Sequence, residues 1–159
     1  MKPFIRLLYG CLLGLGMMTA AAQESLSDLT LITEAYPPYN YQDAGKITGV
    51  AVDVLLEATE KMGDPITQEQ IHLMPWARGY SQALSGPRVM LFTMTRTEAR
   101  EPLFKWAGPV SYSRIVLMAR KDRHIQIERK EDLLNYRIGA IRDDIGEQLV
   151  TEAGVPLSQ

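Results

Sequence analysis

Residues 88–100 read RVMLFTMTRTEAR. The apolar run within 89–92 predicts a short buried strand, because Ser85-Gly86-Pro87 ends the segment before it. Threonine hydroxyls and the guanidinium of Arg100 follow this strand in a polar loop. Donors gathered at one strand end suit the capture of a small anionic group such as a carboxylate. We therefore expect the rest of the chain to build a cleft around this stretch.

Residues 1–22 have the pattern of a secretory signal peptide. Lys2 and Arg6 precede an uncharged apolar run over 7–18, and Ala20-Ala21-Ala22 supplies the small residues of a cleavage site. The apolar run is short for a membrane span and is followed at once by polar residues. A retained membrane anchor is the alternative. We predict cleavage after Ala22 and export to the periplasm.

The composition of the predicted mature chain excludes several functions. Its 137 residues are enough for at most one domain. It has 15 basic and 19 acidic residues, and the resulting net charge of −4 argues against nucleic acid and anionic membranes as partners. The single cysteine, Cys11, lies in the predicted signal, so no disulfide is expected. His72 and His124 are isolated from other ligand-type residues, so we expect no metal and no cofactor.

Strand and helix signals alternate through the first part of the mature chain. One helix is predicted from about 49 to 62, with Ala51, Leu55, Ala58 and Met62 as its buried stripe, and a second begins at Pro75 and ends before Gly86-Pro87. Strands are predicted at 29–33, 66–73 and 88–92. This order predicts an α/β fold with an open, mostly parallel sheet, whose ligands gather at the carboxyl ends of the strands.

The remaining residues resemble the start of a second α/β unit. Residues 110–120 are predicted to be one extended segment, followed by a short helix at 130–135, a strand at 136–141 and a helix that ends at Gly154. One strand and two helices cannot bury a core alone. We therefore expect a second unit that is only begun.

Several motifs together resemble the periplasmic solute-binding proteins of family 3, the polar amino acid type that serves ABC importers. The resemblance covers essentially the whole mature chain, and it rests on the order and spacing of motifs that are individually weak. They are Tyr36-Pro37-Pro38-Tyr39, Gly45 to Leu55, Thr95 to Glu101 with Phe104 to Pro109, and Glu131 to Gly139.

The resemblance implies an α/β clamshell of the type II periplasmic-binding-protein class, with hinge strands between two lobes and the ligand held in the cleft. It divides the chain into a signal peptide at 1–22, a nearly complete first lobe at 23–109, and a hinge strand with a partial second lobe at 110–159. Relatives continue further, so the resemblance implies a truncated gene product or a fragment.

Carried over residue by residue, the resemblance assigns Arg100 to the ligand's α-carboxylate, with Thr95 as the hydroxyl and backbone donor beside it. Tyr36 corresponds to an aromatic residue that packs on the ligand. Glu34 lies one residue from an acidic position of the same loop. For Arg100, the alternative from the residues alone is a surface arginine paired with Glu98 or Glu101.

Three further positions complete the predicted site. In the second lobe, Arg142 corresponds to a basic or polar residue that faces the cleft, and Gly146 lies where amides at a helix start reach the carboxylate. Trp76 either stacks on the ligand at a strand end or belongs to the core. Arg96 is expected to point outward.

The sequence thus predicts a monomeric binding module and not an enzyme. The module is expected to capture an amino acid or similar small zwitterion and to deliver it to an inner-membrane ABC permease. A sensory or regulatory ligand-binding module on the same fold is one alternative. A dehydratase acting on cyclic acids is the other, and it is disfavoured because the sequence shows no nucleophile–base pair and no metal set.

Overall fold

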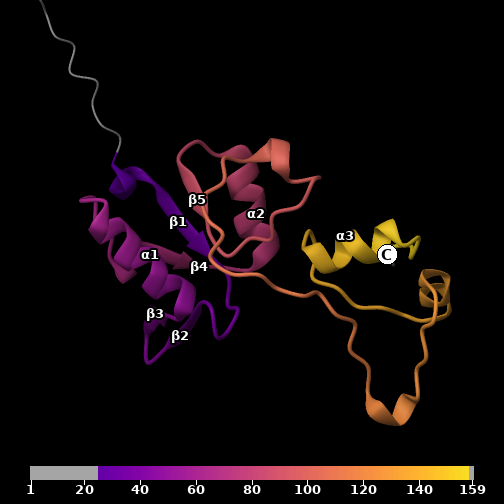
Figure 1. Cartoon of the computed structure of the whole chain (residues 1–159). Helices are drawn as coiled ribbons and strands as arrows, with labels where there is room; N and C mark the ends of the chain where they lie inside the picture. Colours follow the sequence, from indigo (N-terminus) through magenta and orange to yellow (C-terminus); the bar gives the residue numbers. More distant parts are fainter. Residues whose placement is uncertain (1–24, 158–159) are drawn as a thin grey trace, which may run out of the picture.

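A computed structural model describes residues 25–157, and these residues are organised around a three-stranded parallel sheet (Figure 1). The strands are β1 (Thr30–Thr33), β4 (Ile71–Leu73) and β5 (Val89–Leu91), in the order β4-β1-β5. Leu31 pairs with Ile71 on one side and with Met90 on the other. Because β1 is the central strand, its side chains Leu31 to Thr33 are all buried. The predicted α/β fold with a parallel sheet is confirmed.

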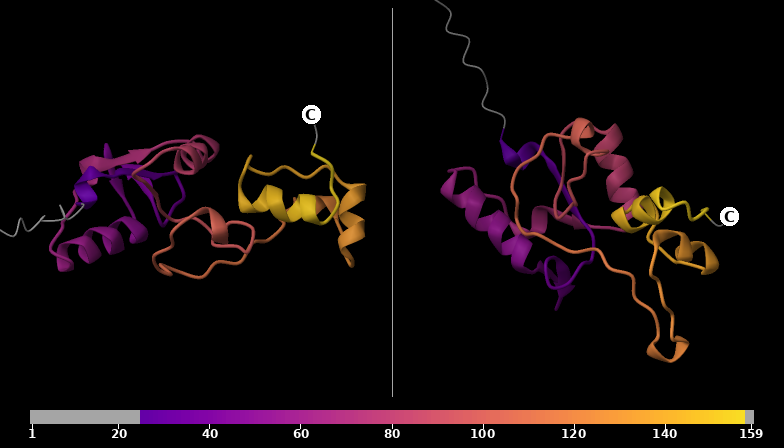
Figure 2. Two further views of the ribbon diagram at one scale, coloured as in Figure 1. Left: turned by 90° about the horizontal axis from the view of Figure 1, so that it is seen from above. Right: turned by 45° about the vertical axis from the view of Figure 1, so that its right-hand side comes forward.

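The two long helices cover opposite faces of this sheet (Figure 2). Helix α1 (Val50–Lys61) places Val52 in a core cluster with Leu31. Helix α2 (Trp76–Ser85) approaches the other face so closely that a Cβ on Gly79 would lie 2.9 Å from Cγ2 of Ile32. Consecutive residues of a strand point to opposite faces, so Leu31 and Ile32 fix one helix on each side.

The predicted buried stripe of α1 is wrong in its second half. Ala58 and Met62 are exposed, whereas Val52 and Thr59 are buried. Ala51 is buried as predicted. The buried face therefore follows 51, 55 and 59 with 52 and 56, and Met62 lies beyond the last helical residue, as the cap. At 3.6 residues per turn the buried face is centred near positions 52 and 59, so the predicted stripe lies along one edge of this face and Ala58 falls on the solvent side of that edge.

The segments that precede α1 and β4 differ in detail from the prediction. The predicted turn near Gly45 joins two short antiparallel strands, β2 (Tyr41–Asp43) and β3 (Lys46–Thr48). Ala44 and Gly45 both have positive φ, the combination that a two-residue hairpin turn needs. Strand β4 is shorter than predicted because residues 68–70 form a 3₁₀ turn, η2 (Gln68–Gln70).

Residues 110–157 contain short helical elements but no strand. The 3₁₀ turns η4 (Lys121–Arg123) and η5 (Lys130–Asn135) are followed by helix α3 (Ile145–Glu152). The helices predicted at 130–135 and after 144 are thereby confirmed, the first as a 3₁₀ helix. The strands predicted at 110–120 and 136–141 are not formed, because no neighbouring strand in the described residues supplies the hydrogen bonds that a sheet requires.

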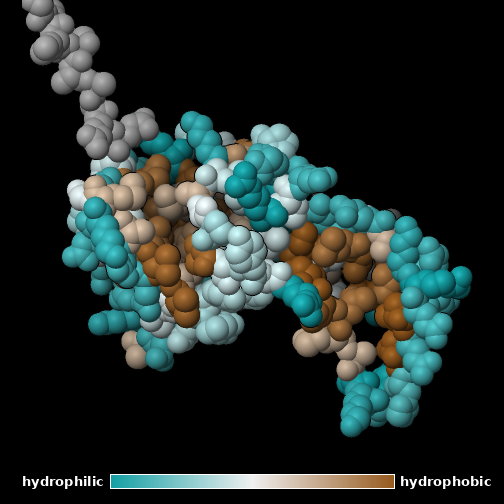
Figure 3. All heavy atoms as spheres, in the orientation of Figure 1, coloured by the Kyte–Doolittle hydropathy of each residue, from teal (hydrophilic) through white to brown (hydrophobic). Residues whose placement is uncertain are grey.

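The extended residues also expose apolar side chains (Figure 3). Between 110 and 157 the exposed large hydrophobic residues are Val110, Tyr112, Ile115, Val116, Leu117, Met118, Ile125, Ile127, Leu134, Ile141, Leu149 and Leu157. An exposed apolar surface of this extent is unusual in a monomer. The division into lobes at 109 and 110 stays a prediction, and the predicted signal peptide at 1–22 lies outside the described residues.

Candidate functional site

Arg100 is the most deeply buried charged residue of the described chain, with 3% of its surface exposed. It lies just before the 3₁₀ turn η3 (Glu101–Leu103), in the loop that follows β5. The loop is held by its own backbone, because the amide of Arg100 donates to the carbonyl oxygen of Thr97 at 3.1 Å. The predicted alternative, a surface arginine paired with a neighbouring glutamate, is therefore wrong.

Two aromatic rings of α2 pack against the guanidinium of Arg100. Its Cζ lies 5.3 Å from the ring centroid of Trp76 and 5.1 Å from that of Tyr80. The two rings are four residues apart on the helix and are themselves stacked, with centroids 5.5 Å apart. Cation–π contacts of this kind stabilise a buried cation without neutralising its charge.

Only backbone carbonyls satisfy the guanidinium in the described part of the chain. Nη1 donates to the carbonyl oxygen of Thr95 at 3.2 Å, and Nη2 donates to that of Asp143 at 2.9 Å. Glu101 is not available to Arg100, because both its oxygens accept from Arg96 at 2.6 Å. A desolvated cation without a carboxylate partner is costly. Arg100 is thus chemically prepared to receive an anionic group.

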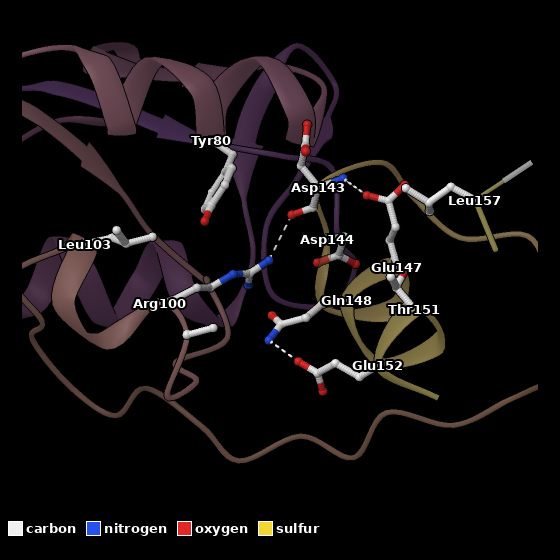
Figure 4. Close-up of a pocket in the computed structure, with 11 residues that line it drawn as sticks. Tyr80, Arg100, Leu103, Asp143, Asp144, Glu147, Gln148, Thr151, Glu152 and Leu157 are labelled. Carbon is white, nitrogen blue, oxygen red and sulfur yellow. Dashed lines mark hydrogen bonds between the residues drawn. The ribbon is translucent and has the colours of Figure 1, made fainter. Parts of the chain in front are cut away.

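A cavity of about 440 Å³ opens beside Arg100 (Figure 4). One wall comes from α2 and the loop around η3, and the opposite wall comes from the start and face of α3. The lining residues are Tyr80, Ala99, Arg100, Leu103, Asp143, Asp144, Glu147, Gln148, Thr151, Glu152 and Leu157. The volume is sufficient for a small organic ligand.

The structure brings Thr95 and Trp76 to Arg100, and of the two alternatives for Trp76 it shows the one in which the residue belongs to the core. The carbonyl oxygen of Thr95 accepts from Arg100, and the predicted donation from Thr95 to a ligand stays a prediction. Trp76 is buried against the guanidinium and does not line the cavity. Arg96 is exposed and lies over Trp106, as its predicted outward direction requires. Trp76 therefore positions the arginine.

The other predicted site residues do not line the cavity. Tyr36 is half-exposed and stacks on Tyr39, with ring centroids 5.7 Å apart. Arg142 is exposed, and Gly146 is in the first turn of α3 with space around it for a side chain. Their roles toward a ligand, like that of Arg100, stay predictions.

Tyr80 and Asp144 are among the lining residues that sequence reasoning does not assign to the site. Tyr80 falls on the inner face of α2 in the sequence pattern, and its four-residue spacing from Trp76 is the signal that could have placed both rings together. Asp144 carries no signal of its own. Asp144 lies opposite Arg100 because the start of α3 forms the other wall of the cavity. The local sequence pattern does not predict that arrangement.

Glu34 directly follows β1 and is half-buried. The side chain of the fully buried Asn40 donates to its backbone carbonyl and holds the loop in place. Burial, and secondarily the negative charge of Asp144, raise the pKa of the Glu34 carboxyl. The charged form of Glu34 is therefore disfavoured in the folded protein.

Replacing Glu34 with glutamine is expected to raise the melting temperature slightly at pH 7. The raised pKa means that the folded state binds the proton more tightly, so the wild-type carboxylate costs stability above the folded pKa and the cost disappears as the pH falls below about 4.5. Solvent screening keeps the effect small. Melting curves of both proteins between pH 4 and 8 measure it, and a wild-type advantage at pH 7 would contradict it.

No helix of the described residues is long and apolar enough to cross a membrane. Within the same residues, no group of three or more histidine, cysteine, aspartate or glutamate side chains could hold a metal ion.

Comparison with known proteins identifies a family. The sequence profile of the bacterial extracellular solute-binding proteins, family 3, matches residues 29–150, which span the sheet, the Arg100 loop and most of α3. Neither a curated protein nor a solved structure matches the chain. Because the profile covers far more than half of the 159 residues, the chain belongs to the family 3 bacterial extracellular solute-binding proteins.

Proposed function

We propose that this protein captures an amino acid or a similar small zwitterion outside the cytoplasm for an ABC importer, with Arg100 as the carboxylate-binding residue. The family is one of solute-binding proteins, which usually are not enzymes. The observation that supports the proposal is the buried guanidinium beside the cavity, with no carboxylate within ion-pair distance in residues 25–157.

The geometry of Arg100 suits a carboxylate ligand. A guanidinium can donate two parallel hydrogen bonds to the two oxygens of a carboxylate. The aromatic rings of Trp76 and Tyr80 hold the guanidinium in place before the ligand arrives, which lowers the entropic cost of binding. Charge-assisted bonds to a desolvated guanidinium contribute roughly 1.5–3 kcal/mol each.

Binding at Arg100 would also alter the contact between the two parts of the chain. In this structure the carbonyl oxygen of Asp143 accepts from Nη2 of Arg100. A ligand carboxylate is a stronger acceptor than a carbonyl and would compete for the same donor. Ligand capture is therefore coupled to the position of residues 143–152 relative to α2.

In the experiment, the purified chain is titrated with single amino acids and with simple carboxylates. Binding is measured by isothermal titration calorimetry and by tryptophan fluorescence. Trp76 lies against Arg100 and is therefore a built-in reporter. We expect saturable binding of at least one α-amino acid and no saturable binding of the corresponding amino alcohol, which lacks the carboxylate. Equal binding of the amino acid and its amino alcohol, or of neither, would overturn the proposal.

A further inference from the structure

Residues 110–130 form a projecting segment, and every residue in it is exposed. The segment leaves the sheet, runs out to the 3₁₀ turn η4 and returns, so that η4 lies at the far end of the excursion (Figure 1 and Figure 2, right). None of its residues lines the cavity beside Arg100. The projecting segment is therefore a surface that the proposed function does not use.

The projecting segment is cationic, although the chain as a whole is acidic. Its six basic residues are Arg114, Arg120, Lys121, Arg123, Arg129 and Lys130. Its two acidic residues are Asp122 and Glu128. The formal charge of the segment is thus +4, and because the whole chain carries −2, the remaining residues carry −6. The net charge of the chain averages over two parts of opposite sign, so the argument from net charge against an anionic partner does not apply to this segment.

Most of these cations are available to an external anion. Inside the segment, Arg120 pairs with Asp122 at 2.6 Å, and at its end Arg129 lies 3.8 Å from Asp132. The segment cations that have no carboxylate within ion-pair distance in residues 25–157 are Arg114, Lys121, Arg123 and Lys130. Two of these four unpaired cations belong to η4 itself.

Exposed apolar side chains lie on both sides of the cationic turn η4. Those that precede it are Ile115, Val116, Leu117 and Met118, and those that follow it are Ile125 and Ile127. Met118 is 90% exposed and is only three residues from Lys121. Apolar surface therefore reaches close to the hydrophilic end of the excursion (Figure 3).

The partner of this surface must be anionic and must also accept apolar side chains. A second copy of the chain would bring two segments of charge +4 together, and like charges repel. A nucleic acid would neutralise the cations, but its phosphates and base edges offer little to a row of aliphatic side chains. A bilayer surface offers anionic headgroups with an apolar layer directly beneath them. It is the partner whose chemistry matches both sets of residues.

We propose that the projecting segment binds the surface of a membrane that contains anionic lipid. Lys121 and Arg123 contact lipid phosphates, and Leu117 and Met118 enter the boundary between headgroups and acyl chains. Clusters of about four to eight Lys and Arg residues are typical of segments that bind anionic lipid, and exposed apolar side chains add to such binding. The contact would hold the solute-binding module close to the membrane without a spanning helix.

Co-sedimentation with lipid vesicles tests the proposal. The predicted mature chain is used, so that the apolar run at 7–18 cannot contribute. We expect saturable binding to vesicles of phosphatidylcholine and phosphatidylglycerol in equal amounts, at least about tenfold tighter than to vesicles of phosphatidylcholine alone, because each cation near an anionic surface adds to the attraction. A high salt concentration should weaken this binding, since it screens the charges.

A double variant tests the cations of η4. Lys121→Gln combined with Arg123→Gln removes two unpaired charges and should weaken binding to the anionic vesicles roughly 30-fold. Lys46→Gln combined with Lys105→Gln is the matched control, because both lysines are exposed, lie outside the projecting segment and give the same change in net charge. This control should change binding by less than about twofold.

A second double variant tests the apolar side chains. Leu117→Ser combined with Met118→Ser should weaken binding at least about tenfold, because two side chains no longer leave water on binding. Leu84→Ser is the matched control, since Leu84 is an exposed leucine of α2 outside the segment. It should change binding by less than about twofold. All the substituted side chains are exposed, so circular dichroism should show an unchanged fold.

Several results would overturn the proposal. They are no saturable binding to the anionic vesicles, equal binding to both kinds of vesicle, and unchanged binding in either double variant of the segment. A wild-type dimer in light scattering that Leu117→Ser with Met118→Ser dissociates would assign the surface to a second copy instead. Tighter binding to duplex DNA than to vesicles, insensitive to the serine variant, would assign it to nucleic acid. The lipid preference of the wild-type chain decides the question even if a variant does not fold, and amino acid binding at Arg100 is measured separately.

Discussion

Replacing Arg100 with methionine is expected to weaken the binding of an amino acid ligand by roughly 10²- to 10⁴-fold, since two charge-assisted hydrogen bonds of roughly 1.5–3 kcal/mol each are lost. Methionine is preferred to alanine because its unbranched side chain can still fill part of the space between Trp76, Tyr80 and the loop. Calorimetric titration of both proteins with the tightest-binding amino acid measures the effect.

Arg96→Met is the matched control. Arg96 is exposed and paired with Glu101, so its loss should change ligand affinity by less than about twofold. Circular dichroism of both variants shows whether the fold is retained. Ligand affinity within a factor of about two of wild type in Arg100→Met would remove Arg100 from the binding site.

Truncation of Arg100 to alanine would report on more than ligand binding. The side chain is buried, packs on two aromatic rings and satisfies the carbonyls of Thr95 and Asp143. Alanine would leave a void and two carbonyls without this donor, so stability would fall along with affinity. Methionine leaves the same two carbonyls without this donor but fills more of the space, so the comparison of methionine with alanine measures what the void alone costs in stability.

Gly49→Ala is expected to lower the free energy of unfolding by roughly 3–5 kcal/mol, because it combines an unfavourable backbone conformation with a backbone clash. Gly49 precedes α1 with a φ of 125°, which side chains rarely allow. A Cβ there would overlap the carbonyl groups of Tyr39 and Pro38. Those carbonyls accept the first two amides of α1, from Val50 and Ala51, and cannot move without losing these bonds.

Urea denaturation followed by tryptophan fluorescence measures this loss. Gly45→Ala is the control, because Gly45 also has a positive φ, of 84°, but a Cβ on Gly45 would have no other atom within 4 Å. It should cost only about 1 kcal/mol. Equal losses in the two variants would show that the close approach of the 38–39 carbonyls to Gly49 is not important for stability.

The order of elements in the first part of the chain could be predicted because its signals are local. Pro75 and Gly86-Pro87 bound α2, Gly63 and Pro65 follow α1, and short apolar runs mark the three parallel strands. The strand ends were less predictable. Residues 68–70 close a 3₁₀ turn instead of continuing β4, a choice that depends on the side-chain oxygen of Gln70 accepting from the amide of Thr67 at 2.7 Å.

The prediction of strands at 110–120 and 136–141 was wrong for a different reason. Both segments have the apolar composition of strands, but a strand exists only with a partner that satisfies its backbone groups. The composition of a segment indicates its tendency to form a strand, but it does not predict whether another strand lies beside it. In residues 25–157 the parallel pairing is confined to β4, β1 and β5.

The sequence by itself determined the α/β class, the family and the identity of Arg100 as the residue of interest, because all three depend on residue types at fixed spacing along the chain. Only the tertiary structure decided what surrounds Arg100. Trp76 and Tyr80 of α2 meet the guanidinium, and the carbonyl of Asp143 and the carboxylate of Asp144 come to the same cavity from a distant part of the chain. These contacts join segments whose relative positions depend on packing, and packing is a property of the whole folded chain.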